Sequence, residues 1–525
     1  MVSGERDDAS VKESNGHARH NGGHARASTS LDPDWSALRA TAHKLLDASL
    51  DKMEKATEGR CWTPTPDGLK QRLTSPVPTG PLSHEELSTR LQELLPYGSG
   101  NTHPRHFGWV QGSGNPGGVL PEMVAAAMNP NCGGRDHAAL YIERQVLAWC
   151  REIMQFPADS GGLLVSGTSM ATILALKTAR DSKLGFGPSR KGGLQEACAQ
   201  SGCRLLVGYA AEGVHTCVSR AFDVLGLGAS AMRKVPVHDD FTMDVEALDA
   251  MVLADEAEGL TPFVVVGTAG SVNVGSIDDL SAIANLAARR GLWMHIDGAI
   301  GAVSILCDEV RASGRLAGME RADSLAFDFH KWLHVNYDCG CVLIRDGDAH
   351  KRTFSDRPDY LAPYERGLAA NNPWPVDYGL ELSRSFRALK VWAHLLEHGT
   401  KRLGKAIGAN LAHARHLAEL VDAAKPLERL APVSLSVVVF RYVPVANGSK
   451  PLSAAALDEL NDLIVVELQE SGVAAPSTTR INGQLAIRCN ITNHRTRFED
   501  LTLLVEAVQR IGSRLAPSTD SVSVN

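Results

Sequence analysis

Lys331 stands in an unusual setting, directly after a short apolar run and between His330 and Trp332. The run Ser324–Phe327 is typical of a buried strand, and it ends at Asp328. Lysine is rarely buried without a partner, and burial lowers the pKa of an amine and makes it more nucleophilic. Lys331 is therefore a candidate for imine chemistry with a carbonyl group. A strand-end lysine that extends to solvent is the simpler alternative, and Lys331 alone does not exclude it.

The turn Ser166–Ser169 has the composition of an anion site. It joins the apolar run Gly161–Val165 to a helical segment, Met170–Arg180. Free backbone N–H groups at the start of that helix, with the hydroxyls of Thr168 and Ser169, can bind a phosphate. The turn matches neither a Walker loop nor the GxGxxG fingerprint. Either hydroxyl could equally be an ordinary helix N-cap.

Asp297 and His215 complete a possible constellation. Asp297 ends the apolar run LWMHI, and a carboxylate there would favour the protonated form of a heterocyclic nitrogen. His215 opens a helical segment and could stack on a ring. A helix cap or a buried ion pair is the alternative for Asp297, and a core histidine is the alternative for His215. Pyridoxal 5'-phosphate needs all four features: an amine, an anion site, a carboxylate and a stacking group.

Alternating strands and helices must position these residues. The predicted strands are Gly161–Val165, Arg204–Tyr209, Phe263–Gly267, Leu292–Ile296, Ser324–Phe327 and Cys341–Arg345, and the predicted helices among them include Asp136–Met154, His215–Leu225 and Asp278–Arg289. Apolar strands separated by helices predict an α/β fold with a mainly parallel sheet covered on both faces. Ligands of such sheets bind at the carboxyl ends of the strands. Ser166–Ser169, Asp297 and Lys331 all follow a strand, so we expect them to converge.

The chain of 525 residues is long enough for more than one domain. We predict five parts: a disordered tail (1–30), an N-terminal helical arm with a pocket segment (31–110), a large α/β domain (111–400), a small α+β domain (401–513) and a second tail (514–525). The polar stretch 346–376 shows no clear periodicity and is predicted to be a mobile catalytic loop. A helix is predicted over Leu380–His398, and strands over Ser434–Tyr442 and Gln484–Ile491 alternate with helices over Ala454–Ser471 and Arg497–Ile511.

Composition and charge limit the classes of partner that we expect for this protein. A net charge of -7 argues against nucleic acid as a main partner, and no apolar run reaches the length of a membrane span. The ten cysteines form no convincing metal pair, and without a secretory signal they indicate a reducing cytoplasm. Three histidines in the N-terminal tail lack companion ligands, so no metal is predicted.

The sequence resembles the group II pyridoxal-phosphate-dependent decarboxylases, the family of aromatic-L-amino-acid, glutamate and histidine decarboxylases. The matching motifs are Asp328-Phe329-His330-Lys331-Trp332, His295-Ile296-Asp297-Gly298-Ala299, Ser166-Gly167-Thr168-Ser169 with Ala171-Thr172, His215 with Val218 and Arg220, and Ser385-Phe386-Arg387-Ala388-Leu389-Lys390. They occur in the family's order, and with their flanks the resemblance extends from about Leu31 to Ile511.

The resemblance implies a homodimer of the fold type I class, with a seven-stranded-type sheet and pyridoxal phosphate as cofactor. Lys331 is similar to the lysine that forms the imine with the cofactor. Asp297 is similar to the partner of the pyridinium nitrogen, and His215 to the ring-stacking histidine. The positions on the phosphate side are Thr168, Ser169 and His330. Asp328 lies where some members have asparagine.

The resemblance also implies the reaction. Tyr360, in Arg357-Pro358-Asp359-Tyr360-Leu361, is similar to the loop tyrosine that protonates the carbanion after CO2 leaves. Members that form aldehydes have phenylalanine there, so tyrosine favours decarboxylation to an amine. The segment Pro104–Gln111 is similar to the family's substrate pocket, and His103, Trp109 and Gln111 are its predicted pocket residues.

Trp109 and Gln111 differ from the aromatic decarboxylases, and Ile300 follows Ala299 where an aromatic residue is common. An aromatic substrate is favoured. Acidic or diamino acids (glutamate, aspartate, 2,4-diaminobutyrate) stay open as substrates. The alternative activities are those of a carbon–carbon lyase or an aldehyde synthase on the same fold. A non-catalytic binding protein is disfavoured because every expected catalytic position is filled.

Overall fold

The computed structural model describes residues 31–356, 364–445 and 451–516. Its largest sheet has seven strands in the order β1-β7-β6-β5-β4-β2-β3. They are β1 (Gly161–Val165), β2 (Leu206–Ala211), β3 (Met232–Val235), β4 (Thr261–Thr268), β5 (Trp293–Asp297), β6 (Ser324–Asp328) and β7 (Gly340–Ile344). Neighbouring strands are parallel except at β7, which is antiparallel to both β1 and β6. The predicted mainly parallel sheet is confirmed.

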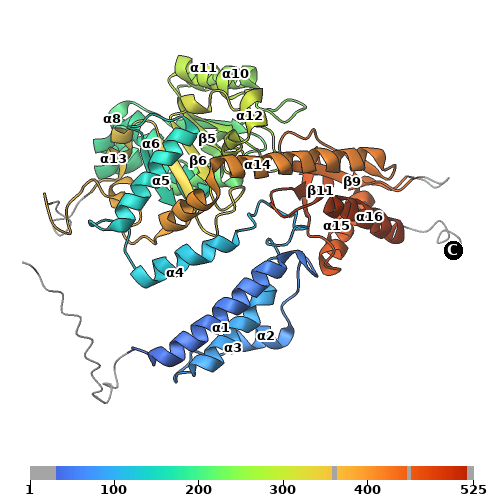
Figure 1. Cartoon of the computed structure of the whole chain (residues 1–525). Coiled ribbons are helices and arrows are strands. Elements are labelled where there is room, and N and C mark those ends of the chain that lie inside the picture. The colour runs from blue at the N-terminus through green and yellow to red at the C-terminus, as the bar shows by residue number, and fades with distance from the viewer. Residues whose placement is uncertain (1–30, 357–363, 446–450, 517–525) are drawn as a thin grey trace, which may run out of the picture.

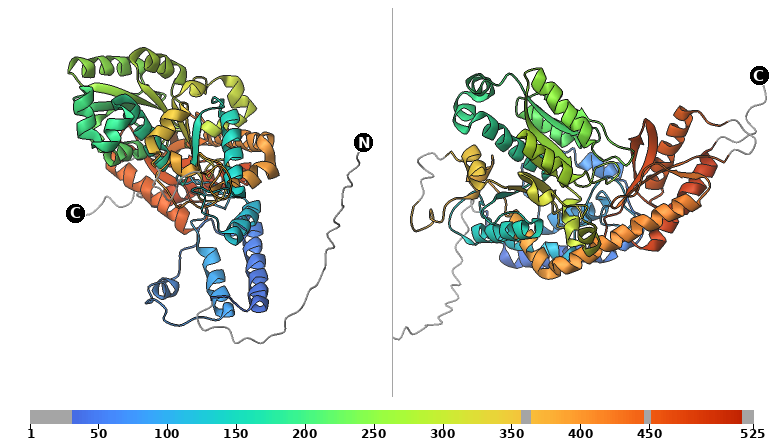
Figure 2. Two further views of the ribbon diagram at one scale, coloured as in Figure 1. Left: turned by 90° about the vertical axis from the view of Figure 1, so that its left-hand side faces the viewer. Right: turned by 90° about the horizontal axis from the view of Figure 1, so that it is seen from above.

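Helices cover both faces of this sheet (Figures 1 and 2). They include α5 (Ala138–Met154), α6 (Thr168–Leu184), α9 (Thr216–Val224), α10 (Val245–Ala257), α11 (Leu280–Arg290), α12 (Asp308–Ser313) and α13 (Gly347–Phe354). Consecutive strand residues point to opposite faces, so Val265 packs into one apolar core and Val266 into another. Burial on both faces explains why these strands read as continuous apolar runs.

A second sheet of four antiparallel strands has the order β10-β11-β9-β8. The strands are β8 (Leu427–Arg429), β9 (Val437–Tyr442), β10 (Ser477–Ile481) and β11 (Gln484–Asn490), and the helices α15 (Ala454–Glu470) and α16 (Phe498–Leu515) pack on them. The long helix α14 (Arg387–Ala423) extends from the large sheet to this one, and its backbone is non-helical at Gly399 (Figure 1).

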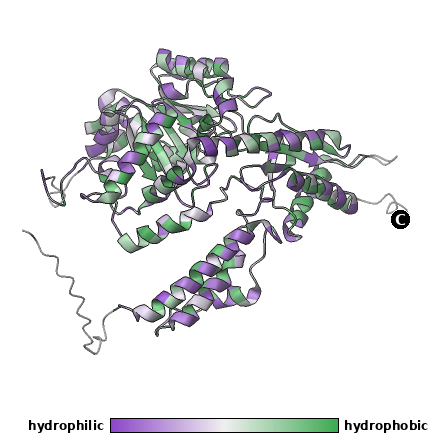
Figure 3. Cartoon of the chain, viewed as in Figure 1, coloured by the Kyte–Doolittle hydropathy of each residue, from purple (hydrophilic) through white to green (hydrophobic). Residues whose placement is uncertain are grey.

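The N-terminal helices stand away from the two sheets (Figures 1 and 2). They are α1 (Trp35–Glu54), α2 (Asp67–Arg72) and α3 (His84–Leu94), and α4 (Val119–Met128) follows along the body. No residue of α1 is buried. Apolar and polar residues alternate around α1 and α3 (Figure 3). Within the described ranges, no helix combines the length and apolar character needed to cross a membrane.

Two sequence predictions of secondary structure are wrong. The stretch after Asp346 begins with α13, whose N-cap is Asp346. The buried face of this eight-residue helix includes His350 and Thr353, so apolar residues alone do not reveal its period. The helix predicted from Leu380 begins only at Arg387. Before it, the backbone N–H of Arg384 donates to Oδ1 of Asn131 and its guanidinium pairs with Glu143, which holds this segment out of the helix. The strand β3 and helix α10 were not predicted.

Candidate active site

The carboxyl ends of β2, β4, β5 and β6 open onto one cavity of about 470 Å³. Its wall includes His215 after β2, Thr268 at the end of β4, Asp297 at the end of β5 and Lys331 after β6. Of the residues expected to converge, Asp297 and Lys331 line this cavity, whereas the Ser166–Ser169 turn is not part of its wall. The described residues in and around the cavity supply a cation, a buried carboxylate and an imidazole within one site.

Lys331 is ion-paired. Its Nζ lies 2.8 Å from Oδ2 of Asp328, and the lysine side chain is 22% exposed whereas the aspartate is buried. Burial acts to lower the pKa of Lys331, but the charge and hydrogen bond of Asp328, with a contribution from Asp297, outweigh it and raise this pKa. The expectation that burial would lower the pKa of Lys331 is therefore wrong for the protein without cofactor. The sequence pattern did not reveal that the preceding aspartate points back at the lysine.

Asp297 is a buried carboxylate that makes no ion pair with a described residue. Its Oδ1 accepts from the Ala299 N–H at 3.2 Å, and the Cys217 thiol lies 3.8 Å from Oδ2. Burial raises the pKa of Asp297, whereas the Lys331 ammonium acts to lower it. A buried charge without a counter-ion is costly, so the site calls for a cationic group beside Asp297. The pyridinium N–H of a bound cofactor is such a group.

His215 is the N-cap of α9, where its Nδ1 accepts from the Cys217 N–H at 3.1 Å. Burial is the main reason that the pKa of His215 is lowered, while Asp297 acts in the opposite direction. The imidazole is therefore mainly neutral at pH 7. Because the cap hydrogen bond fixes the ring at the cavity wall, His215 presents a flat, uncharged surface to a planar ligand.

The residues predicted to lie on the phosphate side meet around Asp328. The Thr168 N–H, at the start of α6, donates to Oδ1 of Asp328 at 2.8 Å, and Nε2 of His330 lies 3.8 Å from Oδ2. The buried Thr168 hydroxyl has no hydrogen-bond partner, so it is available to a ligand. Ser169 is exposed one residue further along the helix. The ring of His330 lies against that of Tyr337, with centroids 4.3 Å apart and the two planes tilted by 34°.

Two of the three predicted pocket residues line this cavity, and one does not. Trp109 and Gln111 lie in its wall. His103 lines a neighbouring cavity of about 460 Å³ instead, between the N-terminal helices and the body. There its Nδ1 accepts from the Arg105 N–H, and burial lowers its pKa to about 4. His103 is absent from the wall of the cavity that contains Lys331, so the geometry does not support the prediction for this residue.

Several site residues were missed by sequence reasoning. Arg488 reaches the cavity from β11 of the small sheet, and its guanidinium donates to the carbonyls of Trp109 and Asn273. Its Nη2 has no partner, and burial lowers its pKa to about 10, so it stays a cation at pH 7. A charged residue inside the apolar strand QLAIRCN was the available signal. Tyr337 also lines the cavity.

Gly112 explains how the pocket segment approaches Lys331. A Cβ on Gly112 would lie 2.2 Å from the carbonyl oxygen of His330 and 2.4 Å from that of Lys331. Only glycine permits this contact, because both obstacles are backbone atoms. The tight approach places the neighbouring Gln111 in the cavity wall.

A model of the pyridoxal-dependent decarboxylase conserved domain matches residues 66–443, most of the chain. The protein belongs to the pyridoxal-dependent decarboxylases. It is 30% identical over 507 residues to an aromatic-L-amino-acid decarboxylase of Bacillus atrophaeus, which covers 94% of this chain and 100% of the relative. It is 25% identical to tyrosine/DOPA decarboxylase 5 of Papaver somniferum, over 91% of this chain and 93% of that one.

Solved structures agree with the family assignment in fold. Mouse CSAD superposes with a TM-score of 0.83 at 23% identity over 91% of this chain and 99% of that one. A second structure comes from Vibrio parahaemolyticus and is described as the glutamate decarboxylase domain of a diaminobutyrate-pyruvate transaminase and L-2,4-diaminobutyrate decarboxylase. Its TM-score is 0.78 at 26% identity, over 92% of this chain and 97% of that one. The fold is that of the type I pyridoxal-phosphate enzymes.

The cofactor of this decarboxylase is pyridoxal 5'-phosphate, and the cavity fits it. The unpaired carboxylate of Asp297 suits the pyridinium. The unpartnered hydroxyl of Thr168, at the start of α6, suits the phosphate; Thr168 lies outside the cavity wall and is connected to Lys331 through Asp328. Asp328 does not suit a phosphate in the same way, because its carboxylate already accepts the hydrogen bond of the Thr168 N–H. His330, whose Nε2 lies within 3.8 Å of Asp328, faces that anion.

Proposed function

We propose that this enzyme decarboxylates an aromatic L-amino acid to the corresponding amine and CO2. The observation that carries the proposal is the buried, unpaired Asp297 in the same cavity as Lys331. When bound, pyridoxal phosphate supplies a ring that accepts the electron pair left by departing CO2. Asp297 keeps the ring nitrogen protonated, because its buried negative charge favours the cationic form.

Each of the other residues around the cofactor has one task in this proposal. Lys331 attaches the cofactor and later recovers it, so that product is released. His215 supports the ring face. Thr168, Ser169 and His330 hold the phosphate. Asp328 keeps the Lys331 ammonium in place when the lysine is not attached.

Arg488 supports the proposal for substrate binding. It is a buried cation with an unpartnered Nη2, and it makes no ion pair with a described residue. Its two carbonyl contacts, to Trp109 and Asn273, fix its direction without neutralising it. A substrate carboxylate would satisfy Nη2 by a charge-assisted hydrogen bond. We assign Arg488 to the substrate's α-carboxylate.

The remaining wall favours a flat apolar side chain. Trp109, Val110, Val272, Ile300 and Tyr337 line the cavity around the polar groups. An aromatic side chain buries a large apolar area against such residues. The named functions of the Bacillus atrophaeus and Papaver somniferum relatives point in the same direction.

An acidic amino acid is the second candidate substrate, and Arg488 is the observation that favours it. The same guanidinium could bind a side-chain carboxylate. The two candidates differ in a measurable way. If Arg488 binds the α-carboxylate, Arg488→Gln lowers kcat/KM for every substrate by a similar factor. If it binds a side-chain carboxylate, the variant loses only acidic substrates.

Tyr360, proposed as the general acid, lies outside the described residues. Its role rests on the resemblance of Arg357–Leu361 to the family's loop. We expect Tyr360→Phe to slow amine formation, because the proton donor to the carbanion is removed. In the presence of dioxygen, which would take up the two electrons as hydrogen peroxide, aldehyde and ammonia should appear. Full amine formation by Tyr360→Phe would show that another group delivers the proton.

We also propose a homodimer. The apolar side chains exposed on the N-terminal helices and α4 are Trp35, Leu50, Leu87, Leu91, Leu94, Leu120, Met123, Val124 and Met128. On α3 the spacing of Leu87, Leu91 and Leu94 places them on one face, which a second copy would bury. Light scattering should give twice the chain mass. The cytoplasmic location predicted from the cysteines stays part of this proposal.

The test is a comparison of specificity constants for tyrosine, phenylalanine, tryptophan, glutamate and 2,4-diaminobutyrate with cofactor-loaded enzyme. The proposal expects the largest kcat/KM for an aromatic acid, with the amine as product. A larger value for glutamate would favour the acidic alternative. Aldehyde and ammonia as main products would show that the enzyme is an aldehyde synthase, the alternative activity on this fold.

A further inference from the structure

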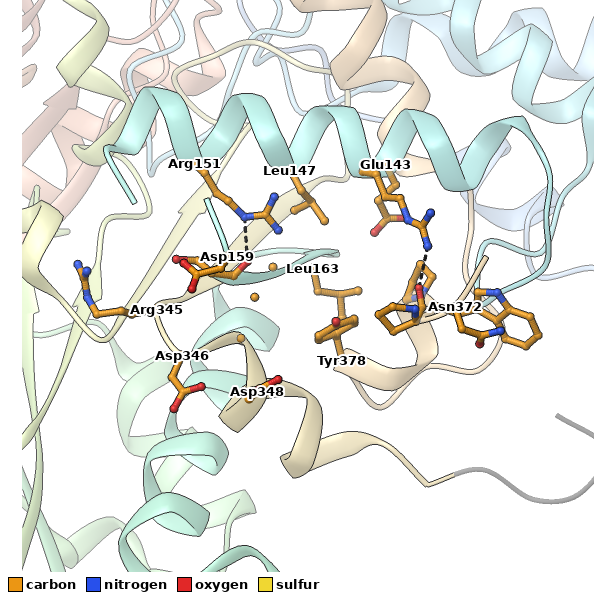
Figure 4. A pocket seen from close by; sticks show the side chains of 18 of the residues that line it. Glu143, Leu147, Arg151, Asp159, Leu163, Arg345, Asp346, Asp348, Asn372 and Tyr378 are labelled. Carbon is orange, nitrogen blue, oxygen red and sulfur yellow. Dashed lines mark hydrogen bonds between the residues drawn. The ribbon is translucent and has the colours of Figure 1, made fainter. Parts of the chain in front are cut away.

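A second large cavity lies at the other end of β1 from the cofactor site. β1 begins at Gly161, which lines this cavity, and ends before the Ser166–Ser169 turn of the active site. The volume is about 610 Å³, within the range of small-molecule sites. Its walls are α5, the start of β1, the start of α13 and the segment Asn372–Tyr378 (Figure 4).

One end of the cavity carries charged side chains of both signs, including Arg151 and Arg345. Asp159, Asp346 and Asp348 line it, and Figure 4 shows Asp159 on one side of the gap and the other two opposite. Asp346 is the N-cap of α13 and accepts from the Ala349 N–H. Asp159 and Asp348 form no hydrogen bond or ion pair with a described residue. Two carboxylates thus have unused acceptor capacity.

The arginines of the cavity are already engaged. Arg144 donates through Nη2 to the carbonyls of Asn371 and Pro373, and Arg151 donates through Nε to that of Ser160 at 2.8 Å. Arg345 donates to two backbone carbonyls and lies over the ring of Phe156. The guanidiniums stay cationic, because backbone carbonyls carry no charge, but none of them forms an ion pair with Asp159 or Asp348.

Two buried polar atoms in the wall also lack partners. Ser160 is 2% exposed, and its Oγ has no hydrogen bond. Oδ1 of Asn372, a carbonyl acceptor, is buried without a donor. Unsatisfied buried polar groups are rare in folded proteins, and a bound ligand is one explanation for them. Oδ1 of Asn372 requires a donor, and Oγ of Ser160 can accept from one.

The opposite part of the cavity is apolar. Leu147 from α5 and Leu163 from β1 face Tyr378 across it (Figure 4). Leu140, Pro373, Trp374 and Pro375 extend this wall. A cavity with two unpaired carboxylates at one end and apolar side chains at the other fits a molecule with a cationic head and a hydrophobic body.

We propose that this cavity binds a primary arylalkylamine or alkylamine, the product class of the decarboxylation. The assignment rests on the proposed function for the source of the ligand. The ammonium donates to Asp159 and Asp348, and the hydrophobic body lies between Leu147, Leu163 and Tyr378. The parent amino acid carries an additional carboxylate, which the unpaired aspartates would repel. Because Arg151 and Arg345 offset part of this repulsion, we expect the amino acid to bind more weakly than the amine.

The experiment is calorimetric binding of phenethylamine to holoenzyme whose cofactor has been fixed on Lys331 by borohydride, so that exchange at the active site cannot occur. The variant is Asp159→Lys, since this exposed residue tolerates substitution. The matched control is Glu152→Lys, an exposed acid on α5 that does not line the cavity. A second variant, Asp348→Asn, removes one acceptor without reversing its charge.

We expect Asp159→Lys to weaken phenethylamine binding about tenfold or more, because a charge-assisted hydrogen bond becomes a repulsion. Asp348→Asn should weaken it less, and Glu152→Lys should leave it within about twofold. Unchanged melting temperatures show that the variants fold. Weaker binding in the Asp159 and Asp348 variants, with binding retained in the Glu152 variant, supports the site.

Three results would overturn the inference: no phenethylamine binding to the reduced holoenzyme, equal affinity in the Asp159 and Glu152 variants, or equal affinity for L-phenylalanine. None of these measurements depends on turnover. If the protein is an active decarboxylase but does not bind phenethylamine here, the proposed function is supported and the inference about binding is contradicted. If the protein binds phenethylamine in this cavity but forms no amine, the inference about binding is supported and the proposed function is contradicted.

Discussion

Nζ of Lys331 lies 2.8 Å from Oδ2 of Asp328, three residues earlier in the chain. The carboxylate therefore stabilises the ammonium form of the lysine, and the pKa of Lys331 is raised although burial acts to lower it. A charged ammonium cannot attack a carbonyl, so we expect Asp328 to slow cofactor attachment.

Asp328→Asn should make cofactor attachment faster near neutral pH. The amide keeps an acceptor for the Thr168 N–H but removes the charge that raises the pKa of Lys331. Each unit by which this pKa falls gives about tenfold more free amine at a fixed pH. Stopped-flow absorbance of apoenzyme mixed with cofactor, followed from pH 6 to 9, measures the effect. An unchanged pH profile would show that Asp328 does not control Lys331.

Asp297→Asn should separate cofactor binding from turnover. The variant retains Lys331, so the cofactor still attaches, but the buried charge that favours the pyridinium is lost. We expect kcat to fall by about 100-fold or more, in line with the loss of a single preorganised electrostatic contact in other enzymes. Retained cofactor absorbance with lost activity is the expected combination. Near-normal kcat would contradict the role given to Asp297.

Acid stability should depend on His394, which is 4% exposed on α14 and accepts through Nδ1 from Asn115. Burial, the largest cause, lowers its pKa to about 3. The unfolded chain takes up a proton as the pH falls below about 6.5 and the folded protein does not, so stability is present above that pH and is lost below it. At pH 5 this loss is about 2 kcal/mol.

His394→Phe removes that titration. Its stability should change less between pH 7.5 and 5 than that of the parent, even if the lost Asn115 contact lowers both values. Urea unfolding at the two pH values measures the difference. The exposed His238→Phe serves as control. If His394→Phe loses as much stability as the parent on acidification, this histidine is not among the groups responsible.

The central site could be predicted because its chemistry follows strand ends. Asp297 and Lys331 come directly after apolar runs, and parallel strands bring their carboxyl ends together. His215 was found because it opens a helix after β2. Such local signals are preserved in the sequence, since each depends only on the residues beside it.

Other site features depend on contacts between distant segments. Arg488 enters the cavity from a separate sheet, which no local pattern reveals. His103 lies six residues from Trp109, yet a turn directs it into another cavity. The sign of the Lys331 pKa shift depended on where the Asp328 side chain points. Side-chain direction and the packing of sheets against each other are tertiary properties.

The most direct test of the account uses L-tyrosine labelled with ¹³C at the carboxyl carbon, incubated with the cofactor-loaded protein and, in parallel, with Lys331→Ala. The account predicts labelled CO2 and tyramine in equal amounts from the parent, and neither from the variant, which should also retain no cofactor after borohydride reduction. Amine formation by Lys331→Ala at the parent's rate, or covalent cofactor elsewhere in the chain, would contradict it.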